Sequence, residues 1–367
     1  MKLEKQFIAC AITLAIVSGS WLSAQVQTIV PEVVAGAKPV TVEHIKIHGA
    51  ALEGNLEGDA VDRDALVFLP PSYEKDKRRH YPVVYALHGY SIGAEQWSHE
   101  IHVPQTIEGA FATGSHEVIV VLPDSKTVYN GSMYSSSATT GDFENYIARD
   151  VVAYMDAHYR TIPSRQSRGL VGHSMGGYGA SRIGMKHPEV FGALYIMSPC
   201  CMSPMAGGFG PADQMKERAI ASEKKVADAK SPADLAAQSP GFAAAQYATA
   251  AAWAPDPKNP PLYFDLPTKD GVPVPEIQAK YAANAPLVFV DQYIGNLKQY
   301  RAIAMDVGDQ DGLRFDATKL HNILDNYGIA NSFEIYSGTH TSAVADRFQN
   351  HVLPFFSKNL CFTADCR

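Results

Sequence analysis

The chain has 367 residues, 46% of them apolar, and a formal net charge of −7 at pH 7. This length and apolar content are enough for a full core in one large domain with an insertion, or in two small domains. The charge is negative and the sequence contains no run of Lys or Arg. It therefore gives no basis for nucleic acid or an anionic membrane surface as a partner.

The first 24 residues have the pattern of a secretory signal peptide. Lys2 and Lys5 precede an apolar stretch at residues 7–17, and small or polar residues follow as far as Ala24. We expect cleavage after Ala24, where a small residue occupies the cleavage position. The apolar stretch is short for a bilayer span, and an uncleaved anchor is the alternative. The mature protein is predicted to be periplasmic or secreted, with no stable membrane span.

The elements that follow alternate between strands and helices. Residues 25–41 are small, Pro-containing and irregular, and we expect a linker there. Apolar runs predict strands at 42–47, 65–69, 81–87, 118–122, 167–171, 193–197, 301–307 and 332–336. Helical patterns lie between them at 144–159, 178–187 and 315–327, and in a closing segment through 356. This order indicates an α/β fold with a mainly parallel central sheet flanked by helices.

The alternation breaks at about residues 202–294, which are first Ala-rich and polar and then Pro-rich. We expect a partly helical cap over the carboxyl end of the sheet; a flexible surface excursion is the alternative. The predicted organisation is a signal peptide at 1–24, a linker at 25–41, an α/β domain at 42–360 that contains this cap, and a tail at 361–367.

The most informative motif is Gly-His-Ser-Met-Gly-Gly at residues 172–177. It follows a predicted strand and opens a helix, so Ser174 is expected on a sharp turn that projects its hydroxyl as a nucleophile. A second match to G-x-S-x-G lies around Ser91. Ser174 is favoured because small residues after it let the helix pack closely on the sheet. Ser91 instead follows His88 in a loop of the type that supplies an oxyanion-hole amide.

An activated serine needs a general base, and His340 is the candidate. It follows the predicted strand at 332–336, so it shares the carboxyl edge of the parallel sheet with Ser174. A histidine in a surface loop without catalytic function is the alternative. His88 and His173 are expected to be structural.

The base must be held by a carboxylate, and three aspartates lie near the end of the strand at 301–307. Asp306 still lies in the strand and Asp309 can cap the turn, so Asp311 is best placed to face the histidine. The chain order Ser, Asp, His is that of α/β-hydrolases. Asp309-x-Asp311-Gly lacks the remaining ligands of a calcium loop, and neither a metal nor an organic cofactor is predicted.

Negative charge develops on the substrate carbonyl oxygen, so backbone N–H donors are needed beside Ser174. We expect them from Met175, directly after the serine, and from Tyr90 in the loop after His88. Trp97 and Tyr134 follow strand ends and are candidates for lining the substrate pocket. Burial of both rings in the core is an equal alternative.

Removal of Cys10 with the signal peptide leaves Cys200, Cys201, Cys361 and Cys366, which allow three pairings. Cys200 and Cys201 follow the carboxyl end of a strand, whereas the other two follow the last helix, which runs away from that end. A local Cys361–Cys366 bridge is therefore expected. Cys200 and Cys201 are expected to be buried thiols, with a vicinal disulfide as the alternative.

Together these motifs resemble the putative esterase family of α/β-hydrolases, which includes esterase D, feruloyl esterases and the antigen 85 mycolyltransferases. The matching pieces are YPVVYALHG at 81–89, GHSMGGYGA at 172–180, GDQDGL at 308–313 and GTH at 338–340. The resemblance implies the α/β-hydrolase fold, with the acid on Asp311 and the oxyanion-hole donors on Tyr90 and Met175.

The function implied is an exported serine carboxylesterase that works through an acyl-enzyme. Its substrate would be a small-molecule or polysaccharide-linked ester, with feruloyl and other aryl esters as candidates. Two alternatives stay open: acyl transfer through the same three residues, as in the mycolyltransferases, and a non-catalytic binding module on the same fold. The oligomeric state is not predicted.

Overall fold

The computed structural model describes residues 26–204 and 212–363, so the predicted signal peptide and Cys366 lie outside the described residues. Its main element is a sheet of eight strands in the order β1-β2-β4-β3-β7-β8-β11-β12. The bounds are Thr41–His48 (β1), Asp62–Leu69 (β2), Val83–Leu87 (β3), Ile119–Pro123 (β4), Arg168–His173 (β7), Ala193–Met197 (β8), Ala302–Gly308 (β11) and Ser332–Tyr336 (β12).

Six adjacent strands, from β4 to β12, run parallel to one another. Next to them, β2 pairs antiparallel with β4, and β1 pairs antiparallel with β2. The central strands consist of buried residues because helices cover both faces, which explains their unbroken apolar sequences. The predicted mainly parallel sheet is confirmed. In the register, Gly172 pairs with Leu87 on one side and with Ile196 on the other, so the strand before Ser174 lies in the middle of the sheet.

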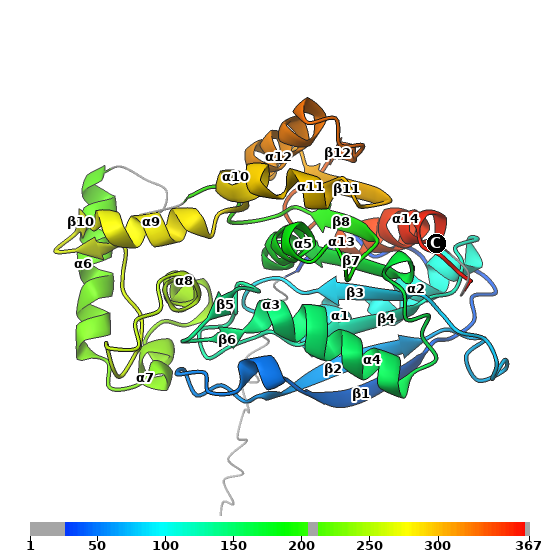
Figure 1. Cartoon of the computed structure of the whole chain (residues 1–367), viewed down its shortest axis with the longest axis horizontal. Helices are drawn as coiled ribbons and strands as arrows, with labels where there is room; N and C mark the ends of the chain where they lie inside the picture. Colours follow the sequence, from blue (N-terminus) through cyan, green and yellow to red (C-terminus); the bar gives the residue numbers. More distant parts are fainter. Residues whose placement is uncertain (1–25, 205–211, 364–367) are drawn as a thin grey trace, which may run out of the picture.

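Two layers of helices enclose the sheet (Figure 1). One face carries α1 (Ala94–Glu100), α2 (Val103–Ala112), α13 (Val344–Arg347), the π-helical turn η6 (Phe348–Val352) and α14 (Leu353–Asn359). The other carries α3 (Phe143–Asn145), the π-helical turn η2 (Tyr146–Val151), α4 (Val152–His158), α5 (Met175–Lys186) and α12 (Arg314–Asn326). Short turns η1 (Ala50–Leu52) and η3 (Arg165–Ser167), and the hairpin of β5 (Ser136–Ser137) and β6 (Gly141–Asp142), complete this part.

The sequence did not predict α1 and α2. His102 separates them with a left-handed backbone (φ 51°), so the two helices are too short to show a sustained helical period. The closing helix continues beyond the expected end at 356, to Asn359.

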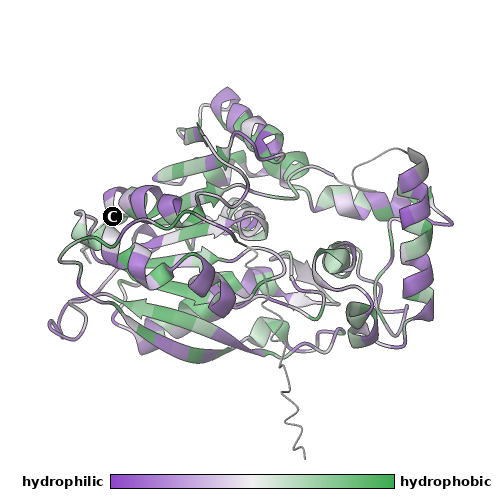
Figure 2. Cartoon of the chain, turned by 180° about the vertical axis from the view of Figure 1, so that it is seen from behind, coloured by the Kyte–Doolittle hydropathy of each residue, from purple (hydrophilic) through white to green (hydrophobic). Residues whose placement is uncertain are grey.

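Residues 212–297 form a largely helical insertion, which we call the cap. Its elements α6 to α9 lie beyond one end of the sheet, whereas α10 and α11 lie against α5 (Figure 1). Its most distant helix, α6, is mostly hydrophilic, whereas the strands of the sheet are mostly hydrophobic (Figure 2). The elements are α6 (Ala212–Asp228), α7 (Pro232–Ala237), η4 (Gly241–Ala244), α8 (Ala245–Trp253), β9 (Thr268–Lys269), β10 (Val272–Pro273), α9 (Pro275–Ala283), α10 (Pro286–Phe289), η5 (Val290–Tyr293) and α11 (Ile294–Leu297).

The segment expected to be a linker lies along the surface of the domain. The backbone N–H of Ile29 donates to the carbonyl of Ser342 at 2.8 Å, and Thr28 Oγ1 accepts from the N–H of Ala345 at 3.1 Å. Farther along, the N–H of Val40 donates to Glu108 on α2 at 3.0 Å. The segment is thus attached to the loop that follows His340. Among the helices in the described ranges, none has the length and apolar character needed to cross a bilayer.

Candidate active site

Ser174 lies at the junction of β7 and α5 with a left-handed backbone (φ 59°, ψ −114°). Such a conformation costs a non-glycine residue about 1–3 kcal/mol, so the surroundings must enforce it. The glycines beside the serine make the tight turn sterically possible. A Cβ at Gly172 would collide with the backbone of Gly176, and a Cβ at Gly176 would collide with the carbonyl of Leu87. The turn therefore projects the hydroxyl of Ser174 at the carboxyl edge of the sheet.

The structure brings Ser174, His340 and Asp311 together in one hydrogen-bonded line. Ser174 Oγ lies 2.9 Å from His340 Nε2, and His340 Nδ1 lies 2.7 Å from Asp311 Oδ2. A carboxylate beside Nδ1 favours a proton on that nitrogen, which leaves the lone pair of Nε2 directed at the serine hydroxyl. The arrangement can thus accept a proton from Ser174.

Asp311 is buried, with 4% of its side chain exposed, and it also accepts a hydrogen bond from the N–H of Leu313 at 2.9 Å. Burial alone would raise its pKa, but the hydrogen bond and the positive charge that His340 offers outweigh this, so the pKa lies below its usual value. The carboxylate is therefore ionised at neutral pH and orients the imidazole.

The other two candidate acids are engaged elsewhere. Asp309 Oδ1 accepts from the N–H of Gly338 at 2.9 Å and supports the loop that carries His340. Asp306 is buried beneath the sheet edge, where it accepts from Arg347 Nε and from the hydroxyl of Tyr195, both at 2.8 Å. Of the three aspartates, Asp311 is the one in contact with the histidine.

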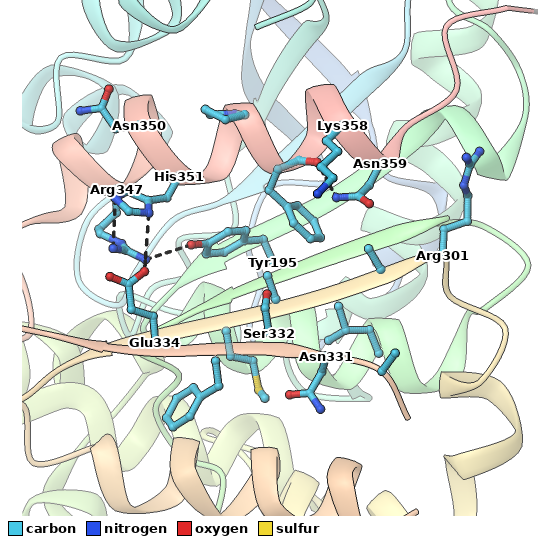
Figure 3. Close-up of a pocket in the computed structure, with 18 residues that line it drawn as sticks. Tyr195, Arg301, Asn331, Ser332, Glu334, Arg347, Asn350, His351, Lys358 and Asn359 are labelled. Carbon is cyan, nitrogen blue, oxygen red and sulfur yellow. Dashed lines mark hydrogen bonds and ion pairs between the residues drawn. The ribbon is translucent and has the colours of Figure 1, made fainter. Parts of the chain in front are cut away.

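Arg347 also borders a cavity of about 690 Å³ between the β11–β12 edge and α14. Figure 3 shows its guanidinium directed at Glu334 and Tyr195 on the wall of this cavity. Neither Ser174 nor His340 is among the lining residues. The cavity is therefore separate from the candidate active site.

The loop around Tyr90 passes directly beside the serine. A Cβ built on Gly89 would lie 3.6 Å from Ser174 Cβ. The Tyr90 hydroxyl donates to the carbonyl of Tyr129 at 2.7 Å, and the N–H of Ser91 donates to Asn130 at 3.0 Å, which fixes the loop. Within residues 26–204 and 212–363, the amides of Tyr90 and Met175 donate to no other group. They are available as donors to a substrate oxygen.

The two histidines expected to be structural are held by backbone groups. His88 Nε2 accepts from the N–H of Ser125 at 2.9 Å, and its Nδ1 donates to the carbonyl of Gly89 at 2.8 Å. His173 Nε2 donates to the carbonyl oxygen of His340 at 2.9 Å. Burial, with the nearby charge of His340, lowers the pKa of His173 to about 3, so this ring is neutral in the working range.

Trp97 and Tyr134 are fully buried, which corrects the expectation that they line the pocket. Trp97 packs edge-on against Phe348 between α1 and η6, on the opposite side of the sheet from α5. Tyr134 lies behind the Tyr90 loop, where its hydroxyl donates to the carbonyl of His88 at 3.1 Å. Both are the core aromatics that the sequence left as the alternative.

Phe242, in η4 of the cap, lies outside every motif of the sequence. Its side chain is 72% exposed, and its ring centroid lies 5.4 Å from that of Tyr90. An isolated phenylalanine in an Ala-rich stretch belongs to no periodic pattern, so only the tertiary contact reveals it. Phe242 thus packs against the ring of Tyr90, the residue whose amide is a candidate oxyanion-hole donor.

Comparisons with known proteins point to one family. A family model described as "Putative esterase" matches residues 60–356. An endo-1,4-beta-xylanase/feruloyl esterase of Xylanibacter ruminicola is 26% identical over 36% of this chain and 19% of its own length. An esterase of Mycobacterium tuberculosis is 27% identical over 33% of this chain and 25% of its own length. The chain thus spans a quarter or less of these relatives.

Solved structures show the same fold. A ferulic acid esterase superposes with a TM-score of 0.60 at 22% identity, over 88% of this chain and 99% of that one. An S-formylglutathione hydrolase of Staphylococcus aureus gives 0.54 at 14% identity, over 87% and 98%. MPT51 of Mycobacterium tuberculosis also gives 0.54 at 14% identity, over 88% and 99%.

Proposed function

This chain belongs to the "Putative esterase" family and is an esterase-type hydrolase, and from this premise we propose that it is an exported serine carboxylesterase. We assign Ser174 as nucleophile, His340 as general base and acid, and Asp311 as the residue that orients the histidine. The observation that carries the assignment is the continuous hydrogen-bonded line from Ser174 Oγ through His340 to Asp311.

Acylation begins when Ser174 Oγ attacks the ester carbonyl carbon and His340 Nε2 takes the hydroxyl proton. The carbonyl oxygen becomes an oxyanion, and we assign the N–H groups of Tyr90 and Met175 as its donors. The ionised Asp311 stabilises the imidazolium while the charge lasts. Collapse of the intermediate breaks the ester C–O bond, and His340 returns its proton to the leaving alcohol.

Deacylation repeats the same steps with water as nucleophile. His340 removes a proton from water, the resulting oxygen attacks the acyl carbon, and the proton passes to Ser174 Oγ as the acid is released. His173 supports both halves as a positioning residue, because its hydrogen bond to the carbonyl of His340 fixes the loop that carries the base.

The preferred acyl group is proposed to be aryl, with hydroxycinnamoyl esters as the leading class, in small molecules or on polysaccharides. Phe242 is exposed and its ring pairs with that of Tyr90, which lies in the loop beside Ser174. We propose that a planar substrate ring stacks on this pair. The feruloyl activity in the names of two similar proteins is consistent with this proposal. Export is proposed from the charged and apolar pattern of residues 1–24.

Replacement of Ser174 by Ala tests the catalytic assignment. We expect Ser174→Ala to abolish hydrolysis of p-nitrophenyl acetate and labelling by a fluorophosphonate probe, because the nucleophilic oxygen is gone. Ser91→Ala, at the second copy of the motif, should keep the fluorophosphonate label, and peptide mapping should locate it on Ser174. A labelled and active Ser174→Ala variant would show that the nucleophile lies elsewhere.

A further inference from the structure

Two adjacent cysteines lie where β8 leads out of the sheet, directly beside the candidate nucleophile. The Sγ atoms of Cys200 and Cys201 are 2.6 Å apart, and both side chains are half-buried. The N–H of Cys200 donates to the carbonyl of Ser174 at 3.1 Å. Cys201 has a left-handed backbone (φ 62°), so the chain turns sharply between the two thiols.

This sulfur pair is closer than two thiols in ordinary contact, and it needs little movement to reach the bonding distance of about 2.05 Å. Metal binding is a poor alternative, because in the described ranges no group of three or more His, Cys, Asp or Glu residues is placed to hold an ion. Elsewhere in the chain Cys361 is disulfide-bonded. The fold therefore already contains one oxidised cysteine.

We propose that Cys200 and Cys201 form a vicinal disulfide in the exported protein, and that this bond fixes the turn between the nucleophile and the cap. One thiolate attacks a sulfur of a dithiol-disulfide oxidant, forms a mixed disulfide and releases one oxidant thiolate. The thiolate of the other cysteine then attacks the Sγ atom of the first cysteine in the mixed disulfide, which closes the Cys200–Cys201 bond and releases the second oxidant thiolate. The oxidant leaves as a dithiol, and the two cysteine protons go to solvent or to the oxidant.

The turn between the two cysteines is anchored on both sides, which gives the bond a consequence for the site. Before it, the N–H of Ser198 donates to the carbonyl of Asp306 at 2.8 Å. After it, the carbonyl of Met202 accepts from Leu287 of the cap at 3.0 Å, and Ser203 Oγ donates to Asp316 at 2.7 Å. The eight-membered ring of a vicinal disulfide removes backbone freedom between these anchors, so reduction should loosen the cap relative to Ser174.

Mass spectrometry tests the bond without reference to activity. Protein isolated from the exported fraction is denatured, treated with iodoacetamide without reductant, and digested with trypsin. The peptide that contains both cysteines should be unalkylated and about 2 Da lighter than its dithiol form, and it should take up two carbamidomethyl groups after reduction. Alkylation of both residues in a sample whose Cys361 remains oxidised would overturn the proposal.

The effect on the site is tested kinetically, and this part rests on the proposed esterase function. We expect a phosphine reductant to raise KM for an aryl ester a few-fold in the wild type, with kcat less affected. The Cys200→Ser/Cys201→Ser double variant should not respond, and it controls for reduction at Cys361. A KM that reductant leaves unchanged, with the bond present, would overturn the coupling to the cap. Absence of fluorophosphonate labelling at Ser174 would instead refute the proposed function.

Discussion

At the scale of single residues, three aspartates within a stretch of six positions have three different binding partners. Asp306 pairs with Arg347 beneath the sheet, Asp309 supports the backbone of Gly338, and Asp311 contacts His340. Their sequence context is similar, since all three lie at the end of β11 or in the turn after it. The direction in which each side chain points from the backbone decides its role.

This difference predicts unequal effects of two matched substitutions. Asp311→Asn should lower kcat about 10³- to 10⁴-fold, because an amide can stabilise the wrong tautomer of His340 and cannot stabilise the imidazolium. Asp309→Asn should cost much less, since an amide oxygen can still accept from Gly338. Steady-state kinetics with p-nitrophenyl acetate, with circular dichroism to confirm folding, make the comparison. If Asp309→Asn lowers kcat more than Asp311→Asn does, Asp309 is the residue that orients His340.

At the scale of elements, the cap is attached to the hydrolase core through α8. Trp253 is buried there, where its Nε1 donates to Ser135 Oγ at 3.2 Å and its ring lies 5.6 Å from that of Tyr178 on α5. The turn η4 just before α8 instead leaves Phe242 exposed beside Tyr90. The packing of α8 against the core thus holds the exposed ring of Phe242 beside Tyr90.

Removal of this ring should weaken the binding of aryl substrates. An aromatic pair contributes about 0.5–1.5 kcal/mol, so Phe242→Ala should raise KM for an aryl ester roughly two- to tenfold with little change in kcat. The ratio of KM values for methyl ferulate and p-nitrophenyl acetate measures the effect. Phe362→Ala, after α14 and distant from the serine, is the matched control. If Phe242→Ala and Phe362→Ala give the same ratio of KM values, Phe242 does not contribute to binding of the aryl substrate.

At the scale of the whole molecule, a buried charge cluster joins distant segments. Glu144 Oε2 accepts from Arg182 Nε at 2.7 Å and from Lys186 at 3.1 Å, and Glu144 Oε1 lies 3.3 Å from His187. Arg182 also donates to Asn284 of the cap at 3.0 Å. The cluster therefore connects α3, α5 and the cap in one network, on the face of the sheet where the core is largest.

This cluster predicts a loss of stability in acid. Burial opposes ionisation of Glu144, but the hydrogen bond from His187 and the charges of Arg182 and Lys186 lower its pKa from 4.5 to about 2. A folded pKa below the unfolded one stabilises the protein above pH 4.5, and the stability is lost as the pH falls toward 2. The difference corresponds to roughly 3 kcal/mol.

Urea denaturation at pH 7, 4 and 3 measures this contribution. The free energy of unfolding of the wild type should fall across this range, and Glu144→Gln should be less stable at pH 7 and show a flatter dependence. Glu189→Gln removes an exposed partner of His187 and should keep the wild-type slope. If the free energy of unfolding changes with pH by the same amount in Glu144→Gln and in the wild type, the acid sensitivity arises from other carboxylates.

The sequence by itself determined the alternation of strands and helices, the strand-to-helix turn at Ser174 and the chain order of the three candidate catalytic residues. These features are local, because a buried strand needs an apolar run and a tight turn needs glycine. It also placed Tyr90 and Met175 beside the serine, since both positions follow from the motifs.

Only the tertiary structure decided which side chains meet. It buried Trp97 and Tyr134 in the core and placed Phe242 against Tyr90 across more than a hundred residues of sequence. It also attached the segment after residue 25 to the loop that carries His340. Such contacts depend on how the elements pack. The apolar periodicity of one segment shows which of its faces is buried, but not which other segment packs against that face.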